Sequence, residues 1–83
     1  MITEEAILKN AHISTEEIEN DIKVTDKEIK DFTDEKDVLM RNPIDNRVKI
    51  YMLEGKILKR RDFVADLRAI LEYRKNAIMD KSH

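Results

Sequence analysis

The chain has no cysteine, and it has only one glycine and one proline among its 83 residues. Without cysteine it can form neither disulfides nor thiolate metal sites, and a reducing compartment is compatible with it. Turn-rich β folds need more glycine and proline than this. Because 41% of the residues are charged and only 5% are aromatic, the composition predicts an all-α protein.

Long apolar runs and the pattern of a signal peptide are also missing. Runs such as Tyr51-Met52-Leu53 are far shorter than the ~20 apolar residues that span a bilayer. The chain begins with the acidic segment Met1-Ile2-Thr3-Glu4-Glu5, which is unlike the basic start of a signal peptide. We therefore expect a cytoplasmic protein without a membrane partner.

Charge is distributed unevenly along the chain. Residues 1–40 carry 12 acidic and 5 basic side chains, whereas residues 41–83 carry 6 acidic and 11 basic ones, which gives the overall charge of −2. We therefore expect an acidic N-terminal helical module over residues 1–41 and a basic long helix over residues 42–83, together forming one folding unit. The opposite charges favour contact within one chain or between two, unless they only screen one another.

Three segments of the acidic half share the pattern of a helix N-terminus. Each has an aliphatic residue, a small hydroxyl or aspartate cap, acids in the first turn and a second aliphatic residue. They predict helices near residues 3–11, 14–23 and 25–41, of which the first two are too short to be stable without packing. The three segments are Ile2–Ile7, Ile13–Ile18 and Val24–Ile29.

The basic half predicts one long helix from about Pro43 to about Asp80. Asn42 suits the N-cap and proline suits the first helical turn. About 38 residues of helix extend roughly 57 Å, whereas a compact chain of this size is only about 30 Å across. Apolar residues recur every seven positions, as in a coiled coil, so we expect a second chain to cover them in a homo-oligomer. The predicted oligomer interface comprises Ile50, Leu53, Ile57, Val64, Leu67, Ile70, Leu71 and Ile78.

Residues 48–61 allow two other structures. Val48–Leu53 alternates like a strand, so a turn at Glu54-Gly55 would give a β-hairpin followed by a helix from Asp62. A helical hairpin that bends near Gly55 or at Arg60–Asp62 is the second alternative, because glycine costs ~1 kcal/mol inside a helix. The uninterrupted heptad favours the continuous helix over both.

A segment of the acidic half resembles a helix-turn-helix. The resemblance covers residues 15–32 and lies in the aliphatic spacing and in Val24-Thr25, which opens the second helix. In that family the second helix enters the major groove and its first side chains read bases. The resemblance therefore implies that Thr25, Lys27 and Lys30 face DNA.

This segment also departs from the family. Glu19 stands where a small residue is usual, and Lys23 stands where a turn glycine is usual. The acidic side chains of the second helix would repel phosphates. An antiparallel helix pair packed on Ile18, Ile22 and Ile29 therefore stays an alternative.

The clearest basic cluster is Lys56, Lys59, Arg60 and Arg61. On a helix these residues form a band around the axis, which can bind phosphates, contact the acidic half of a chain, or remain solvated. Arg60 and Arg74 also interrupt the apolar heptad. They either pair with acids and thereby set register or partner choice, or extend their charged ends to water.

Nothing in the sequence predicts an enzyme or a cofactor. His12 falls in a predicted turn and His83 at the end of the chain, while Ser14 reads as a helix cap and Ser82 as a tail residue. The sequence contains neither a glycine-rich phosphate loop nor a His/acid metal pattern.

Two functions are therefore expected. The first is an oligomeric adaptor or regulator whose acidic N-terminal helices bind another protein. The second is a DNA-associated protein with a coiled-coil stalk, loosely similar to transcriptional regulators or to the small terminase subunits of phages. A third, an acidic DNA mimic over residues 16–37, ranks last because the net charge is near zero.

Overall fold

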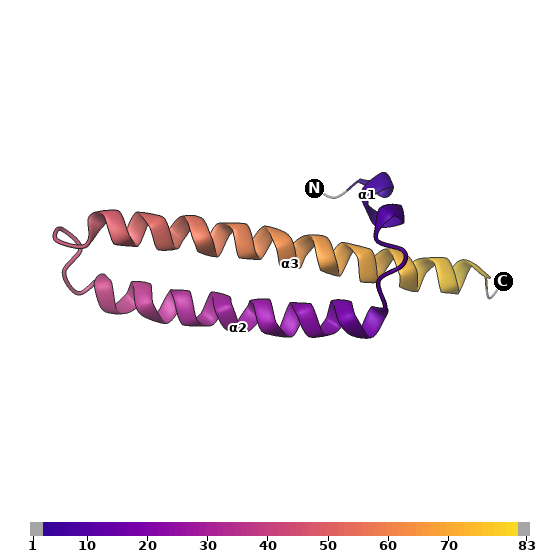
Figure 1. Ribbon diagram of the computed structural model, residues 1–83, viewed down its shortest axis with the longest axis horizontal. Helices are drawn as coiled ribbons and strands as arrows, with labels where there is room; N and C mark the ends of the chain where they lie inside the picture. Colours follow the sequence, from indigo (N-terminus) through magenta and orange to yellow (C-terminus); the bar gives the residue numbers. More distant parts are fainter. Residues whose placement is uncertain (1–2, 82–83) are drawn as a thin grey trace.

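The protein is an antiparallel helical hairpin with a short helix packed near one end (Figure 1). The computed structural model describes residues 3–81, with side chains as far as Asn76. Within this range there are three helices and no strand: α1 (Glu4–Lys9), α2 (Thr15–Leu39) and α3 (Arg47–Lys81). The prediction of an all-α protein is confirmed.

Two of the three predicted helix starts are confirmed. The Thr3 hydroxyl accepts a hydrogen bond from the Ala6 N–H at 3.2 Å, and the Ser14 hydroxyl accepts one from the Glu17 N–H at 3.1 Å. Both side chains satisfy a backbone donor that the first helical turn leaves without a partner. Threonine and serine therefore fix where α1 and α2 begin.

The third predicted helix start is wrong. Residues 14–23 and 25–41 do not form two helices, because α2 continues from Thr15 to Leu39 without a turn. Thr25 does not cap a helix; it is only 5% exposed and lies in the apolar face of α2. The residues that face α3 recur at alternating spacings of four and three, and this packing outweighs a local capping preference. They are Ile18, Ile22, Thr25, Ile29, Phe32, Lys36 and Leu39.

The long helix is confirmed, but it begins four residues later than predicted. Residues 40–46 form a turn, and the first residue of α3 is Arg47. The Asn42 side chain donates to the Asp45 carboxylate at 2.8 Å, and the Asn46 side chain donates to the Asn42 carbonyl at 3.1 Å. Pro43 therefore lies in the loop that reverses the chain, not in the helix.

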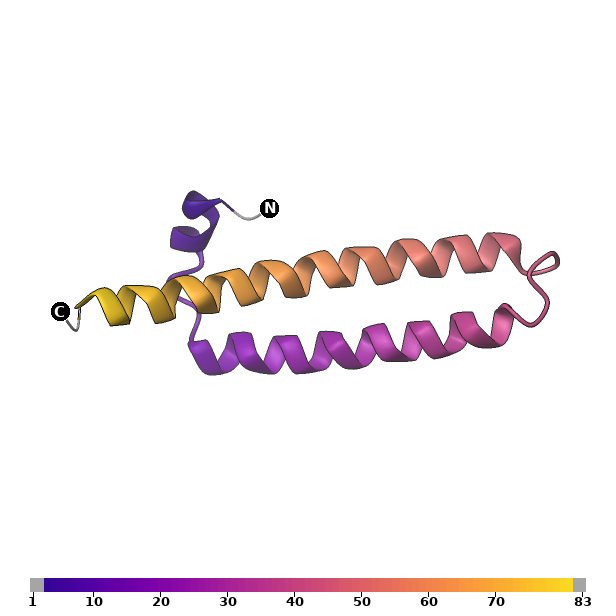
Figure 2. The same cartoon turned by 180° about the vertical axis from the view of Figure 1, so that it is seen from behind.

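Residues 48–61 are helical throughout, which excludes the β-hairpin and the bend. Gly55 has no positive φ and sits inside α3. The antiparallel course of α2 and α3 is clear from both sides of the molecule (Figure 2). The alternation of apolar and polar residues over Val48–Leu53 therefore does not mark a strand.

The heptad stripe of α3 is covered by α2 of the same chain. Six of its residues are buried there: Ile50, Leu53, Ile57, Val64, Leu67 and Ile70. Each contributes about 1.5–3 kcal/mol by leaving water. A second chain would be needed to cover α3 if the molecule were compact. The hairpin is instead elongated, 59 × 20 × 20 Å. A long helix fits this shape because α2, 25 residues in length, runs beside most of it.

Helix α1 closes one end of the hairpin. Ile7 and Ile13 pack against a cluster formed by Ile18, Leu67 and Ile70. In both views α1 lies on the side of α3 that faces away from α2 (Figures 1 and 2). It therefore extends the core cluster at the C-terminal half of α3.

Arg74 holds the segment between α1 and α2. Its guanidinium donates to the carbonyls of Asn10 at 3.0 Å and Ile13 at 2.6 Å, and to the Thr15 hydroxyl at 3.1 Å. Charge-assisted bonds of this kind are about twice as strong as neutral ones. The arginine thus interrupts the apolar heptad in order to bind backbone groups, and not only to reach water.

None of the described helices has the length and apolar content needed to cross a membrane.

Candidate interaction surface

A second apolar stripe runs along the side of α3 that faces away from α2. We call it the outer stripe, and it consists of Val48, Tyr51, Met52, Gly55 and Leu58. These positions are three or four residues apart, so they adjoin one another on one helical face. All five are exposed, with Val48 at 70% and Tyr51 at 76%. The alternation that suggested a strand arises because α3 is apolar on two opposite sides here.

The outer stripe continues into a hollow at the turn of the hairpin. The hollow has a volume of about 440 Å³, and the exposed Ile44 (84%) stands at its edge. Tyr51 belongs both to this hollow and to the outer stripe, so the two form one surface, which we call the outer surface. The hollow is lined by Met40, Pro43, Ile44, Arg47, Ile50, Tyr51 and Glu54.

The outer surface is a concentrated exposure of large apolar side chains. Single exposed aliphatic residues are normal, but adjoining ones that are rimmed by polar groups mark interaction sites. The core of the hairpin is already complete without them, since α2 covers the opposite side of α3. Packing within the chain therefore does not explain why these side chains are apolar.

Basic side chains border the outer stripe on both flanks. Each lies three or four positions from a stripe residue, the spacing at which helical side chains adjoin. No ion pair within the described part of the chain engages them. The basic rim comprises Arg47, Lys49, Lys59 and Arg61.

Other basic residues of α3 pair with acids of α2. Arg60 Nε donates to the Glu28 carboxylate at 3.0 Å, and Arg68 contacts Asp26 at 3.4 Å. Both pairs are substantially exposed, so each contributes at most about 1 kcal/mol. The contact between an acidic and a basic half, expected from the sequence, thus occurs within one chain.

The predicted basic cluster is divided between two roles. The charged ends of Lys56 and Arg60 lie over the Phe32 ring, 5.7 and 5.9 Å from its centroid, where the ring face attracts cations. Lys59 and Arg61 are exposed beside the outer stripe. The helix therefore separates residues that the sequence groups together.

The helix-turn-helix interpretation is wrong for this chain. Lys23, where a turn was expected, lies inside the continuous helix α2, and Thr25 is buried against α3. Thr25 therefore cannot reach DNA without opening the hairpin. Lys27 and Lys30 are exposed on α2 among acidic neighbours, so only these two of the three implied DNA contacts are accessible.

Most residues of the predicted oligomer interface lie between α2 and α3. Six are buried there, and Leu71 packs on the edge of the α1 cluster. The side chain of Ile78 lies outside the described residues, as do Ser82 and His83. The expected homo-oligomer thus loses the uncovered stripe from which it was inferred, and it stays a prediction.

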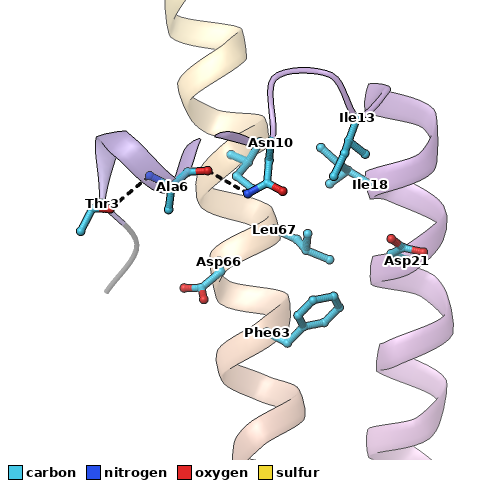
Figure 3. A pocket seen from close by; sticks show the side chains of 10 residues that line it. Thr3, Ala6, Asn10, Ile13, Ile18, Asp21, Phe63, Asp66 and Leu67 are labelled. Carbon is cyan, nitrogen blue, oxygen red and sulfur yellow. Dashed lines mark hydrogen bonds between the residues drawn. The ribbon is translucent and has the colours of Figure 1, made fainter. Parts of the chain in front are cut away.

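A second hollow, of about 390 Å³, lies where α1 meets the hairpin (Figure 3). Its floor is the core itself, formed by Ile18, Leu67 and Ile70. The Thr3 hydroxyl and the Asn10 amide, which both line it, bond to the backbone of α1. We interpret this hollow as the seam between α1 and the hairpin. Among the described residues, no group of acids and histidines is placed to hold a metal ion.

No protein-family model, curated protein or solved structure matches this chain. The structure therefore defines a class, a cysteine-free helical hairpin with an exposed apolar stripe.

Proposed function

We propose that the protein is a non-enzymatic adaptor or regulator that binds another protein through the outer surface. The exposed apolar stripe on a hairpin whose core is already complete is the observation that carries this proposal. Burying a large apolar side chain contributes about 1.5–3 kcal/mol. Tyr51, Met52 and Leu58 can supply the apolar centre of such a contact, with one aromatic residue among them.

A homo-oligomer and a DNA-associated protein are the competing proposals. Self-association would have to use the outer surface, since α2 already covers the heptad stripe. DNA binding would use the basic rim, and its affinity would fall steeply as salt rises. Neither makes use of both the apolar stripe and its positive border, and we therefore rank them below binding to another protein.

Site-specific photocrosslinking in the cells that express the protein tests the proposal. A photoreactive amino acid in place of Tyr51 should crosslink to one reproducible heterologous protein, and the adduct should disappear when Leu58 is also changed to aspartate. The control places the same photoreactive residue at Lys27, which is exposed on α2. Adducts only with a second copy, only with DNA, or equally from Lys27 would contradict the proposal.

A further inference from the structure

We infer that the partner presents an acidic amphipathic α-helix, which packs lengthwise on the outer stripe of α3. This inference rests on the proposed function, because it names the chemistry of the partner at the same surface. Two observations carry it: the shape of the outer stripe and the charge of its border.

The outer stripe has the length and profile of a surface that binds a helix. From Val48 to Leu58 it extends about 15 Å, or three helical turns. Gly55 lies between Met52 and Leu58, and a Cβ placed there would meet nothing within 4 Å. A glycine between larger apolar residues lets the backbone of a second helix approach closely, while Tyr51 and Leu58 flank the crossing. On a partner helix, apolar residues spaced three and four apart would pack against a narrow stripe of this kind.

Charge decides which helix fits. The basic rim contributes four positive side chains, against Glu54 and Asp62 on the same part of α3. Glu54 is already paired with Lys36 of α2 at 3.2 Å. A second copy docked through the same surface would bring two basic rims together, and like charges disfavour such a contact. An apolar stripe bordered by acids on the partner complements the rim on both flanks.

Helix α1 covers a different part of α3. Its Ile7 packs against the core cluster that contains Leu67 and Ile70 of α3. It lies on the side of α3 away from α2 (Figures 1 and 2). Because α1 reaches only the C-terminal half of α3, the outer stripe is left uncovered for a partner's helix.

Two other anionic partners fit the surface less well. Duplex DNA would use the basic rim but leaves the large aliphatic side chains without a contact, since phosphates do not need them. An anionic bilayer would bury apolar side chains and attract lysines, but it gains nothing from a glycine in the stripe. Asp62 and Asp66 continue the same side of α3 and would be pressed against anionic headgroups.

Titration of the isotope-labelled full chain with a designed peptide tests the inference. The probe is a helical peptide of about 20 residues, long enough to hold some helix on its own, with leucines at heptad positions and glutamates on both flanks. We expect amide shift changes confined to residues 44–62, and affinity that falls as salt rises. Lys59→Glu combined with Arg61→Glu should weaken binding by at least about tenfold.

Matched controls separate this contact from general charge attraction. Lys27→Glu combined with Lys30→Glu makes the same charge change on α2 and should leave the affinity within about twofold. A peptide with lysines in place of its glutamates should not bind. Shift changes spread over α2, equal binding of both peptides, or an unchanged affinity of the Lys59/Arg61 variant would overturn the inference.

Vesicles and duplex DNA complete the test. Vesicles of equal parts phosphatidylserine and phosphatidylcholine, and a random-sequence duplex, should each bind more weakly than the acidic peptide at the same salt concentration. Tighter binding of either, abolished by the Lys59/Arg61 change, would overturn the inference. If the acidic peptide fails but the Tyr51 photocrosslink to a heterologous protein persists, the helix inference is wrong and the proposed function stands.

Discussion

Replacing Ile18 by alanine should lower the free energy of unfolding by about 2–5 kcal/mol, the usual range for such a deletion in a packed core. Ile18 is 0% exposed and joins α1, α2 and α3 in a single cluster. A chain of this size has only a few kcal/mol to lose. We therefore expect the variant to be largely unfolded at ambient temperature, as measured by urea denaturation followed by circular dichroism.

Val24 supplies the matched control for this experiment. It lies on the same helix and is about half exposed, so Val24→Ala should change the free energy of unfolding by no more than about 0.5 kcal/mol. Equal losses for Ile18→Ala and Val24→Ala would mean that α2 does not present the face described here to α3.

Replacing Gly55 by proline should destabilise the hairpin by about 3 kcal/mol or more. Proline lacks the N–H that donates to the preceding helical turn, and its ring collides with that turn. Since Gly55 lies inside α3, past its second turn, the break would separate the first part of the apolar stripe from the rest. Helical content and the urea midpoint are the quantities to measure.

A different substitution of Gly55 should raise the stability of the hairpin instead of lowering it. Gly55→Ala should stabilise the hairpin by up to ~1 kcal/mol, because alanine is the better helix former and its methyl group meets nothing within 4 Å. If proline were tolerated and alanine gave no gain, the chain would bend at this residue and α3 would not be continuous.

Periodicity was sufficient to predict α3 but not what covers it. The seven-residue repeat from Ile50 onward correctly favoured one helix through Gly55. It does not state whether the covering helix belongs to the same chain or to another. The matching repeat in α2, from Ile18 to Leu39, contains Thr25 and Lys36 at core-facing positions. A polar residue in each half hides the pattern from an inspection of apolar residues alone.

Two capping patterns in the sequence predicted helix starts that do not occur, because tertiary packing outweighs the local preference. The Val24-Thr25-Asp26 segment has the composition of a helix start, but Thr25 is buried in the middle of α2. Asn42-Pro43 likewise has the composition of a helix start and lies instead in the reversing turn. In both cases the packing of α2 against α3 decides where the helices begin and end. That packing depends on residues far apart in the chain and not on the local segment.

The outer stripe could have been found from the sequence. Val48, Tyr51, Met52, Gly55 and Leu58 have helical spacing, but the same letters also alternate like a strand. Once the helix is continuous, the two apolar stripes of α3 fall on opposite sides, and only one of them faces α2. The hollow at the turn required the structure, because Met40 and Tyr51 come from different elements.

The intrachain pairing of α2 with α3 is the claim on which the free outer surface depends. The chain has no cysteine, so two spin labels can be placed on Lys27→Cys and Asp62→Cys, both exposed, without other changes. We predict a single interlabel distance by pulsed electron paramagnetic resonance, comparable with the 20 Å width of the hairpin. This distance should persist when the labelled chain is diluted into, and refolded with, an excess of unlabelled chain. A dipolar signal lost on that dilution would show that α2 covers α3 of a second copy, and it would contradict the account.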